Sequence, residues 1–154
     1  MADDNLYNAS LRKAMSICAG RECCRSDIRQ KLDSWGLQEK DADKIIGLLV
    51  KEKFIDEERY ALAFVKDKFR YNRWGKIKIS AALRLKNIPE STINIALGSI
   101  DDEDYNSVIK NLIMSHRKTV KAKNQYDLKG KLLRYGLSKG FESHILYDLL
   151  NDLE

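Results

Sequence analysis

A pattern of apolar residues recurs about every 50 residues along this chain of 154 residues. The segment that begins at Ile28 aligns without gaps to the segment that begins at Ile79. A single unit of this size has a small core, and stacking against neighbouring units enlarges that core. The sequence therefore predicts tandem units that pack against one another. The aligned apolar pairs are Leu32 and Leu83, Leu37 and Ile88, Ala42 and Ile93, Ile46 and Leu97, and Leu49 and Ile100.

Each aligned segment has the pattern of two short amphipathic helices joined by a turn. Gly36 and Asn87 tolerate the left-handed backbone conformation and mark the end of the first helix, and Pro89 suits the first turn of the next helix. A third segment, from Leu128, aligns with the other two if four residues are inserted before Gly140. Four residues are close to one helical turn, so the apolar stripe keeps nearly the same phase. No sustained alternation of apolar and polar residues indicates strands, so we expect an all-α fold.

Three acidic stretches mark expected helix starts, DDNLY at 3–7, DEERY at 56–60 and DDEDY at 101–105. An N-cap aspartate accepts bonds from free backbone N–H groups, and acids in the first turn favourably meet the helix dipole. We therefore expect three tandem three-helix repeats that form an elongated, curved body. The repeats are expected at 1–55, 56–100 and 101–154, with helices at about 5–20, 26–35, 39–52, 57–74, 77–86, 90–99, 102–118, 125–139 and 142–152.

Composition indicates a helix-rich globular chain, with one proline, 44% apolar residues and 33% charged residues. No apolar run approaches the roughly 20 residues that would span a bilayer, and the stretch MADDNLYNAS is acidic where a signal peptide carries positive charge. We therefore expect a cytoplasmic protein. Cys18, Cys23 and Cys24 lack the paired spacing and nearby histidines of a zinc site, so buried thiols are favoured over a redox or metal role.

The formal net charge of +5 is unevenly distributed. Residues 66–134 hold 16 Lys and Arg against 7 Asp and Glu, whereas residues 1–65 hold 11 against 12 and residues 135–154 hold 1 against 4. A concentrated basic field attracts polyanions, such as DNA or an acidic protein surface. The alternative is that these are ordinary solvated helix faces.

Helical phasing separates two groups within FVKDKFRYNRWGK, residues 64–76. At about 100° per residue, Lys66, Arg70 and Arg73 cluster on one side of the expected helix. The aromatics Tyr60, Phe64 and Tyr71 cluster on another side, where core packing is favoured over base stacking. Val65 and Phe69 form a second apolar strip. The spacing does not decide on which side Trp74 lies. The candidate partner-binding residues are Lys66, Arg70, Arg73, Trp74, Lys76, Lys78, Arg84 and Lys86 in a first group, and Arg117, Lys118, Lys121, Lys123, Lys129, Lys131 and Arg134 in a second.

No motif indicates an enzyme. The chain has no GxxxxGK[ST] or GxGxxG loop for phosphates and no HExxH pair for a metal. Glu142, Ser143 and His144 are hydrolase-like residue types, but neighbours on a helix point about 100° apart. The pair Asp101 and Asp102 is better explained by the electrostatics of a helix start than by acid-base catalysis. We expect a protein that is not an enzyme and holds no cofactor or metal.

The run FIDEERYALAFVKDKFRYNRWGKIKISAALRLKNI resembles the central segment of the RecX family of recombination regulators. That segment combines an acidic helix start, A-F-V, a glycine and a basic-apolar helix that ends in K-x-I. The stretches CRSDIRQKL and KLLRYGLSKGFESHIL are similar to the first and last blocks of the family. This chain has W-G-K where many members carry G-x-G-P, so its turn is expected to differ locally.

The resemblance implies a non-enzymatic modulator of the RecA recombinase in recombination and DNA repair. RecX-like proteins are built from three tandem three-helix repeats, bind in the groove of the RecA–DNA filament, and mostly inhibit the ATPase, strand-exchange and coprotease activities of RecA; some also bind single- or double-stranded DNA. The alternative is an autonomous DNA-binding helical protein that acts through its basic central region. We expect a monomer.

Overall fold

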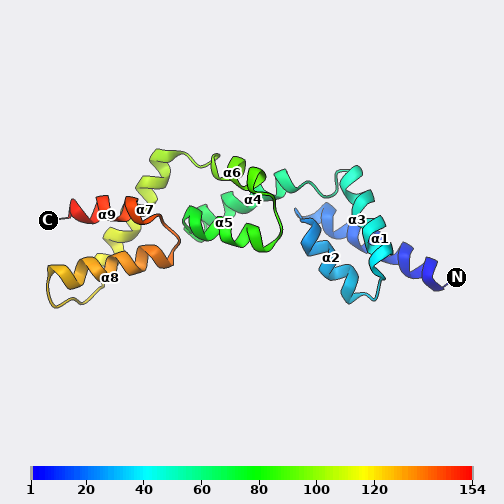
Figure 1. The fold of residues 1–154 in the computed structure, drawn as a ribbon, viewed down its shortest axis with the longest axis horizontal. Coiled ribbons are helices and arrows are strands. Elements are labelled where there is room, and N and C mark those ends of the chain that lie inside the picture. Colours follow the sequence, from blue (N-terminus) through cyan, green and yellow to red (C-terminus); the bar gives the residue numbers. More distant parts are fainter. Residues whose placement is uncertain (1, 154) are drawn as a thin grey trace. The chain divides into compact units, whose positions relative to one another are not determined.

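The computed structural model describes residues 2–153, with side chains from Asp4 onward, and the regular structure of this range is entirely helical. The all-α prediction is therefore confirmed. None of the helices within this range is long and apolar enough to cross a membrane. The helices are α1 (Ala2–Gly20), α2 (Arg25–Ser34), α3 (Glu39–Lys51), α4 (Glu57–Arg70), α5 (Lys76–Leu85), α6 (Glu90–Leu97), α7 (Asp102–Arg117), α8 (Gln125–Ser138) and α9 (Ser143–Asn151) (Figure 1).

Two of the three expected acidic helix starts form N-caps. The Asp56 carboxylate accepts a bond from the backbone N–H of Arg59 at 3.1 Å, and Asp101 accepts one from the N–H of Asp104 at 3.1 Å. These bonds satisfy donors that have no partner within the helix. The first acidic stretch lies inside α1, which begins at Ala2, about one turn earlier than expected.

The turn between the two helices of each aligned segment is closed in the same way. Gly36, Asn87 and Gly140 all have left-handed backbone conformations, with φ of 89°, 61° and 92°. A helix that ends in this conformation satisfies one of its last carbonyls with an N–H from beyond the turn. The closing bonds, each 3.2 Å, run from Leu37 to Leu32, from Ile88 to Leu83 and from Phe141 to Gly136.

Replacing Gly36 by alanine should destabilise the protein by about 1–2 kcal/mol, the cost of a Cβ in the left-handed region. Crowding makes no contribution, because no atom lies within 4 Å of the position of that Cβ. The matched control is Gly47→Ala inside α3. No atom lies within 4 Å of the position of this Cβ either, and the φ of Gly47 is not positive. This variant should be about 0.5–1 kcal/mol more stable than the parent. Urea unfolding monitored by circular dichroism measures both changes. A loss of stability in both variants would contradict the conformational explanation.

Packing divides the chain into two compact units of non-contiguous sequence. Unit 1 comprises Met1–Phe64 and Leu83–Ile93, and unit 2 comprises Val65–Ala82 and Asn94–Glu154. The division into repeats at 1–55, 56–100 and 101–154 rests on the sequence pattern and stays a prediction.

Most positions of the sequence repeat are core positions in the structure. In unit 1, α2 contributes the buried residues Ile28 and Leu32, and α3 contributes Ile45 and Leu49. All three cysteines are also buried, and burial raises the pKa of Cys18 to about 12 and of Cys24 to about 11. The thiols of Cys18 and Cys24 are therefore protonated at neutral pH, which is the chemistry of inert core residues.

In unit 2, α8 packs against both α7 and α9. The completely buried side chains include Ile109 and Ile113 on α7 and Leu132 on α8. Phe141, between α8 and α9, is also fully buried, with its ring 6.0 Å from that of Tyr105 and almost perpendicular to it.

The α4–α5 turn packs directly against the backbone of the α8–α9 turn within unit 2. The N–H of Gly75 donates to the carbonyl of Lys139 at 2.7 Å, and the N–H of Ile77 donates to the carbonyl of Gly140 at 3.0 Å. A Cβ on Gly75 would lie 2.2 Å from the carbonyl carbon of Gly140. This close approach fixes the position of the α4–α5 turn.

Two details of the predicted pattern are wrong. The helix expected at 57–74 ends at Arg70, so Tyr71 falls outside it and is 76% exposed instead of packed. In α6, Ile93 and Ala96 are buried, whereas Leu97, the last residue of the helix, is only half-buried. In the alignment, Ala96 corresponds to Ile45, which is also buried, and Leu97 corresponds to Ile46.

Candidate functional site

Lys66 and Arg70 form an exposed basic pair on α4. They are four residues apart, so both side chains lie on one face of the helix. Neither forms a hydrogen bond or ion pair within the described part of the chain. The buried side of α4 carries Val65, and Phe69 lies with its ring 5.8 Å from that of Tyr105. The expected separation of a basic face from an apolar strip is present on this helix.

Arg73 does not belong to that helical face. It lies in the turn after α4 with a φ of 56°, a conformation that non-glycine residues seldom adopt. The turn closes when the N–H of Trp74 donates to the carbonyl of Lys68 at 3.0 Å. The Arg73 side chain is exposed and has no partner among the described residues. The expected phasing of Arg73 with Lys66 and Arg70 therefore fails, although Arg73 remains accessible.

Trp74 is half-buried, and two lysines contact its ring. The Nζ atoms of Lys68 and Lys78 lie 4.9 and 4.7 Å from the ring centroid. Cation–π contacts of this kind are worth about 0.5–1 kcal/mol each at exposed sites. Trp74 is therefore a partly exposed residue that two ammonium groups contact, and it is not among the buried core residues. Lys68 was not among the residues selected from the sequence.

Lys76 is tied to the fold of unit 2. Its Nζ atom lies 4.6 Å from the ring centroid of Tyr105 and 4.0 Å from an oxygen of Asp102. Its backbone N–H donates to the Tyr105 hydroxyl at 2.9 Å, and that hydroxyl donates to the carboxylate of Glu142. Burial, followed by the bond to Glu142, raises the pKa of Tyr105 above its usual value. This partly buried chain of hydrogen bonds holds the start of α5 against Tyr105 and Glu142, and each of its polar groups has a partner.

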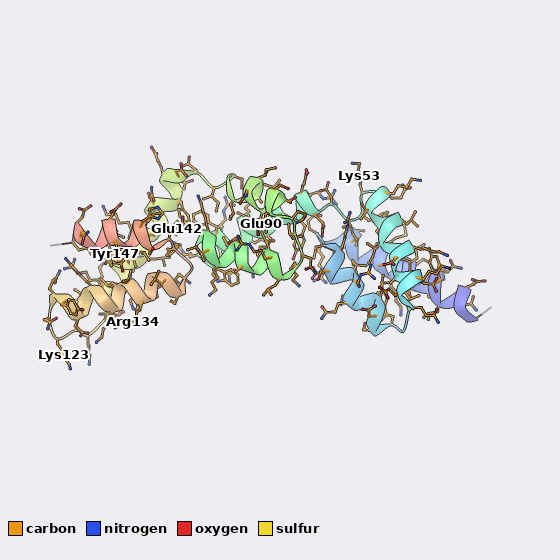
Figure 2. The ribbon with its side chains drawn as sticks, viewed as in Figure 1. Lys53, Glu90, Lys123, Arg134, Glu142 and Tyr147 are labelled. Carbon is orange, nitrogen blue, oxygen red and sulfur yellow. The ribbon has the colours of Figure 1, made fainter. Side chains whose placement is uncertain are left out.

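Arg84 and Lys86 are engaged in ion pairs within unit 1. Arg84 pairs with Glu90, which Figure 2 labels, and the hydrogen bond raises the pKa of Arg84 and lowers that of Glu90. Lys86 donates to Asp27 at 2.6 Å, and this bond raises the pKa of Lys86. These two residues are thus less available to a partner than Lys66, Arg70 and Arg73.

The second basic group extends from the end of α7 through the loop, where Figure 2 labels Lys123, and along α8, where it labels Arg134. Lys131 braces this loop, because its Nζ donates to the carbonyl of Lys121 at 2.6 Å and lies 3.2 Å from Asp127. The backbone N–H of Lys123 also donates to Asp127, and this bond lowers the pKa of that carboxyl below its usual value. The members with exposed side chains are Lys118, Lys121, Lys123 and Arg134, whereas Arg117, Lys129 and Lys131 are half-buried.

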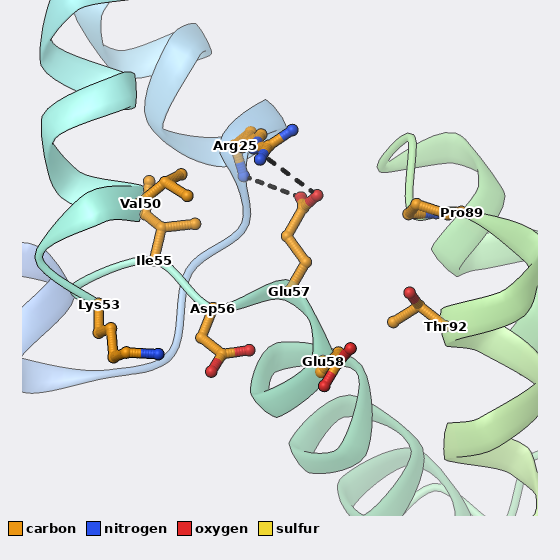
Figure 3. A pocket seen from close by; sticks show the side chains of 9 residues that line it. All are labelled: Arg25, Val50, Lys53, Ile55, Asp56, Glu57, Glu58, Pro89 and Thr92. Carbon is orange, nitrogen blue, oxygen red and sulfur yellow. Dashed lines mark hydrogen bonds and ion pairs between the residues drawn. The ribbon is translucent and has the colours of Figure 1, made fainter.

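A surface hollow of about 410 Å³ lies beside the first turn of α4 in unit 1 (Figure 3). Two of the three carboxylates that line it have structural roles. Asp56 caps α4, and Glu57 accepts a bond from the backbone N–H of Arg25 at 3.1 Å. The N-cap residue of α2, Cys24, provides no side-chain cap, so Glu57 supplies that function from another helix. The lining residues are Arg25, Val50, Lys53, Ile55, Asp56, Glu57, Glu58, Pro89 and Thr92.

The described residues include no group of three or more His, Cys, Asp and Glu side chains that could hold a metal ion. Residues 56–97 match the family model described as the second three-helix domain of RecX.

Relatives named "Regulatory protein RecX" match most of the chain. The protein of Clostridium perfringens is 32% identical over 129 residues, covering 82% of this chain and 58% of its own length. The protein of Clostridium beijerinckii is 32% identical over 147 residues, covering 94% of this chain and 68% of its own length. That of Clostridium acetobutylicum is 30% identical over 156 residues, covering 98% and 71%. The chain thus spans a little over half the length of some relatives and about 70% of others.

Two solved structures share the fold. A crystal structure of regulatory protein RecX superposes with a TM-score of 0.88 at 23% identity, covering 98% of this chain and 74% of that one. The crystal structure of RecX from Lactobacillus salivarius gives a TM-score of 0.83 at 20% identity, covering 97% of both chains. At these identities the solved structures establish the fold, whereas the family is established by the sequence relatives. On the strength of those relatives, the chain belongs to the RecX family of regulatory proteins.

Proposed function

We propose that this chain regulates RecA by binding to the RecA–DNA filament, and that it inhibits ATP hydrolysis, strand exchange and coprotease activity. The observation that carries the proposal is membership of the RecX family over nearly the whole chain. We further propose that the chain acts as a non-enzymatic, cytoplasmic monomer built from three repeats. Binding in a filament groove would impede the movements that accompany ATP turnover.

The accessible cations of the α4–α5 region are the proposed contact. Lys66, Arg70 and Arg73 are exposed and have no partner among the described residues, so forming a new contact breaks no existing ion pair. Arginine binds carboxylate or phosphate with two parallel bonds, and lysine provides a point charge to either. The exposed lysines of the α7–α8 loop are a second proposed contact.

The test is to titrate the protein against RecA filaments on single-stranded DNA and against bare DNA at several salt concentrations. Fluorescence anisotropy follows binding, and a coupled assay follows ATP hydrolysis. We expect inhibition at protein concentrations well below those needed to bind bare DNA. Equal affinity for both, with the steep salt dependence of phosphate contacts, would instead favour the autonomous DNA-binding protein.

The variant Lys66→Glu, Arg70→Glu, Arg73→Glu should bind filaments on the order of 100-fold more weakly, because repulsion replaces three attractive contacts. The matched control is Lys40→Glu, Lys44→Glu, Lys51→Glu on α3. These lysines are also exposed and without partners among the described residues, so the total change in charge is the same. Equal weakening in both variants would mean that net charge, rather than this surface, controls binding.

A further inference from the structure

Helix α5 is apolar on two opposite faces. Ile79 and Leu83 are fully buried, as the sequence repeat requires. On the other side, Ile77 and Leu85 are 53% and 83% exposed, and Ala81 between them is exposed too. These three residues are spaced by four, and each step of four turns only about 40° around the helix. They therefore form one stripe along α5, which is a single helix. Figure 1 shows the course of this helix.

The fold itself does not require this stripe. In the alignment that places Ile28 on Ile79, the counterparts of the stripe residues are Ser26, Gln30 and Ser34 on α2. Helix α2 has the same length as α5, and its buried face is just as well packed. The same structural position is thus polar in one helix and apolar in the other. Exposed contiguous apolar surface on a soluble protein marks an interaction site when folding does not explain it.

Basic residues flank the stripe on both sides. Lys78 and Arg84 lie about 60° to either side of Ala81 on the helix. Lys78 rests on the ring of Trp74, and Arg84 pairs with the exposed Glu90, an arrangement that an incoming carboxylate can replace at little cost. Helix α5 contains no acidic residue. The surface therefore complements an apolar stripe with acidic flanks.

Two other occupants fit less well. A nucleic acid backbone would meet Lys78 and Arg84 but would gain nothing from Ile77 and Leu85, because these apolar side chains would remove water from its phosphates without replacing the lost hydrogen bonds. A second copy of α5 would place these cations against the same cations in a two-fold interface, which is repulsive. We propose that Ile77, Ala81 and Leu85 form a docking stripe for an acidic amphipathic helix of a protein partner. The small side chain of Ala81 lets the axis of such a helix approach closely.

The test replaces the stripe with the residues that α2 carries at the same positions, in the variant Ile77→Ser, Ala81→Gln, Leu85→Ser. The probes are two synthetic helical peptides with the same leucine stripe, one flanked by glutamates and one by lysines. We expect the acidic peptide to bind the parent at least tenfold more tightly than the basic peptide, and the variant to lose this binding while its thermal unfolding is unchanged. The matched control, Leu48→Ser, removes an exposed leucine from α3 and should bind as the parent does. Absence of acidic-peptide binding to the parent, or equal binding to parent and variant, would overturn the inference.

A second arm uses RecA filaments, and the assignment of the docking partner to RecA rests on the proposed function. We expect the variant to bind filaments at least 30-fold more weakly, with the loss persisting at high salt, and to bind bare DNA as the parent does. If the parent binds the acidic peptide but no filament, the proposed function fails and the docking stripe stands. If analytical ultracentrifugation shows a parent dimer that the variant cannot form, the stripe contacts a second copy and the inference is wrong.

Discussion

Gly75→Ala is expected to destabilise unit 2 by about 3–5 kcal/mol. The added Cβ would lie 2.2 Å from the carbonyl carbon and oxygen of Gly140 and 2.4 Å from the N of Phe141, all of them backbone atoms that cannot rotate aside. Overpacking costs about 1–3 kcal/mol, and moving the turn away also breaks two backbone hydrogen bonds worth about 1 kcal/mol each. Conformational strain is not the cause, since Gly75 has no positive φ.

The measurement is urea unfolding, with amide hydrogen exchange to locate the loss of protection to unit 2. The matched control is Gly130→Ala in α8, where the nearest atom to the new Cβ is the mobile end of Arg134 at 3.6 Å. That variant should be neutral or up to about 1 kcal/mol more stable, because alanine favours a helix interior. If Gly75→Ala and Gly130→Ala were equally stable, the close backbone approach could not be a constraint on the turn.

Phe141→Ala is expected to cost about 3–5 kcal/mol, because the fully buried ring would leave a cavity beside Tyr105. Phe141→Leu should cost about 1.5 kcal/mol at most, since the aligned positions Leu37 and Ile88 hold aliphatic side chains in the same turn. Denaturant midpoints measure both. Tyr126→Ala is the control, because this aromatic is 90% exposed and its loss should change stability by about 0.5 kcal/mol or less. An equal cost for Phe141→Ala and Tyr126→Ala would contradict the cavity argument.

Apolar spacing predicted the helical fold well because burial in a helical repeat depends on local periodicity. Ile28 and Ile79 are both buried, and the left-handed residues Gly36 and Asn87 occupy the expected turns. The end of α4 was missed for a physical reason. The residue in the left-handed conformation there is Arg73, which carries no sequence signal for a turn, and the backbone bonds that position the turn come from residues 139 and 140.

The candidate surface could be predicted only where helix geometry decides exposure, as at Lys66 and Arg70. Ion pairs between distant residues are invisible to such reasoning: Lys86 pairs with Asp27, 59 residues away in the sequence. The exposed stripe on α5 had a usable signal, since Ile77 aligns with Ser26 and Leu85 with Ser34. Positions that are apolar in every repeat identify the core. Exposed positions that are apolar in one repeat and polar in another identify candidate binding surfaces.

The contact between the α4–α5 and α8–α9 turns has a consequence for folding order. Lys139 donates to the carbonyl of Asn72, a residue 67 positions earlier, so this turn cannot be completed until most of the chain has been synthesised. Contacts between residues distant in sequence slow folding, because a long loop must close before they form. The two units also alternate along the sequence, so a cut between residues 64 and 94 separates segments of at least one unit. We therefore expect fragments made by cutting there to fold poorly alone and to recover helicity when they are mixed.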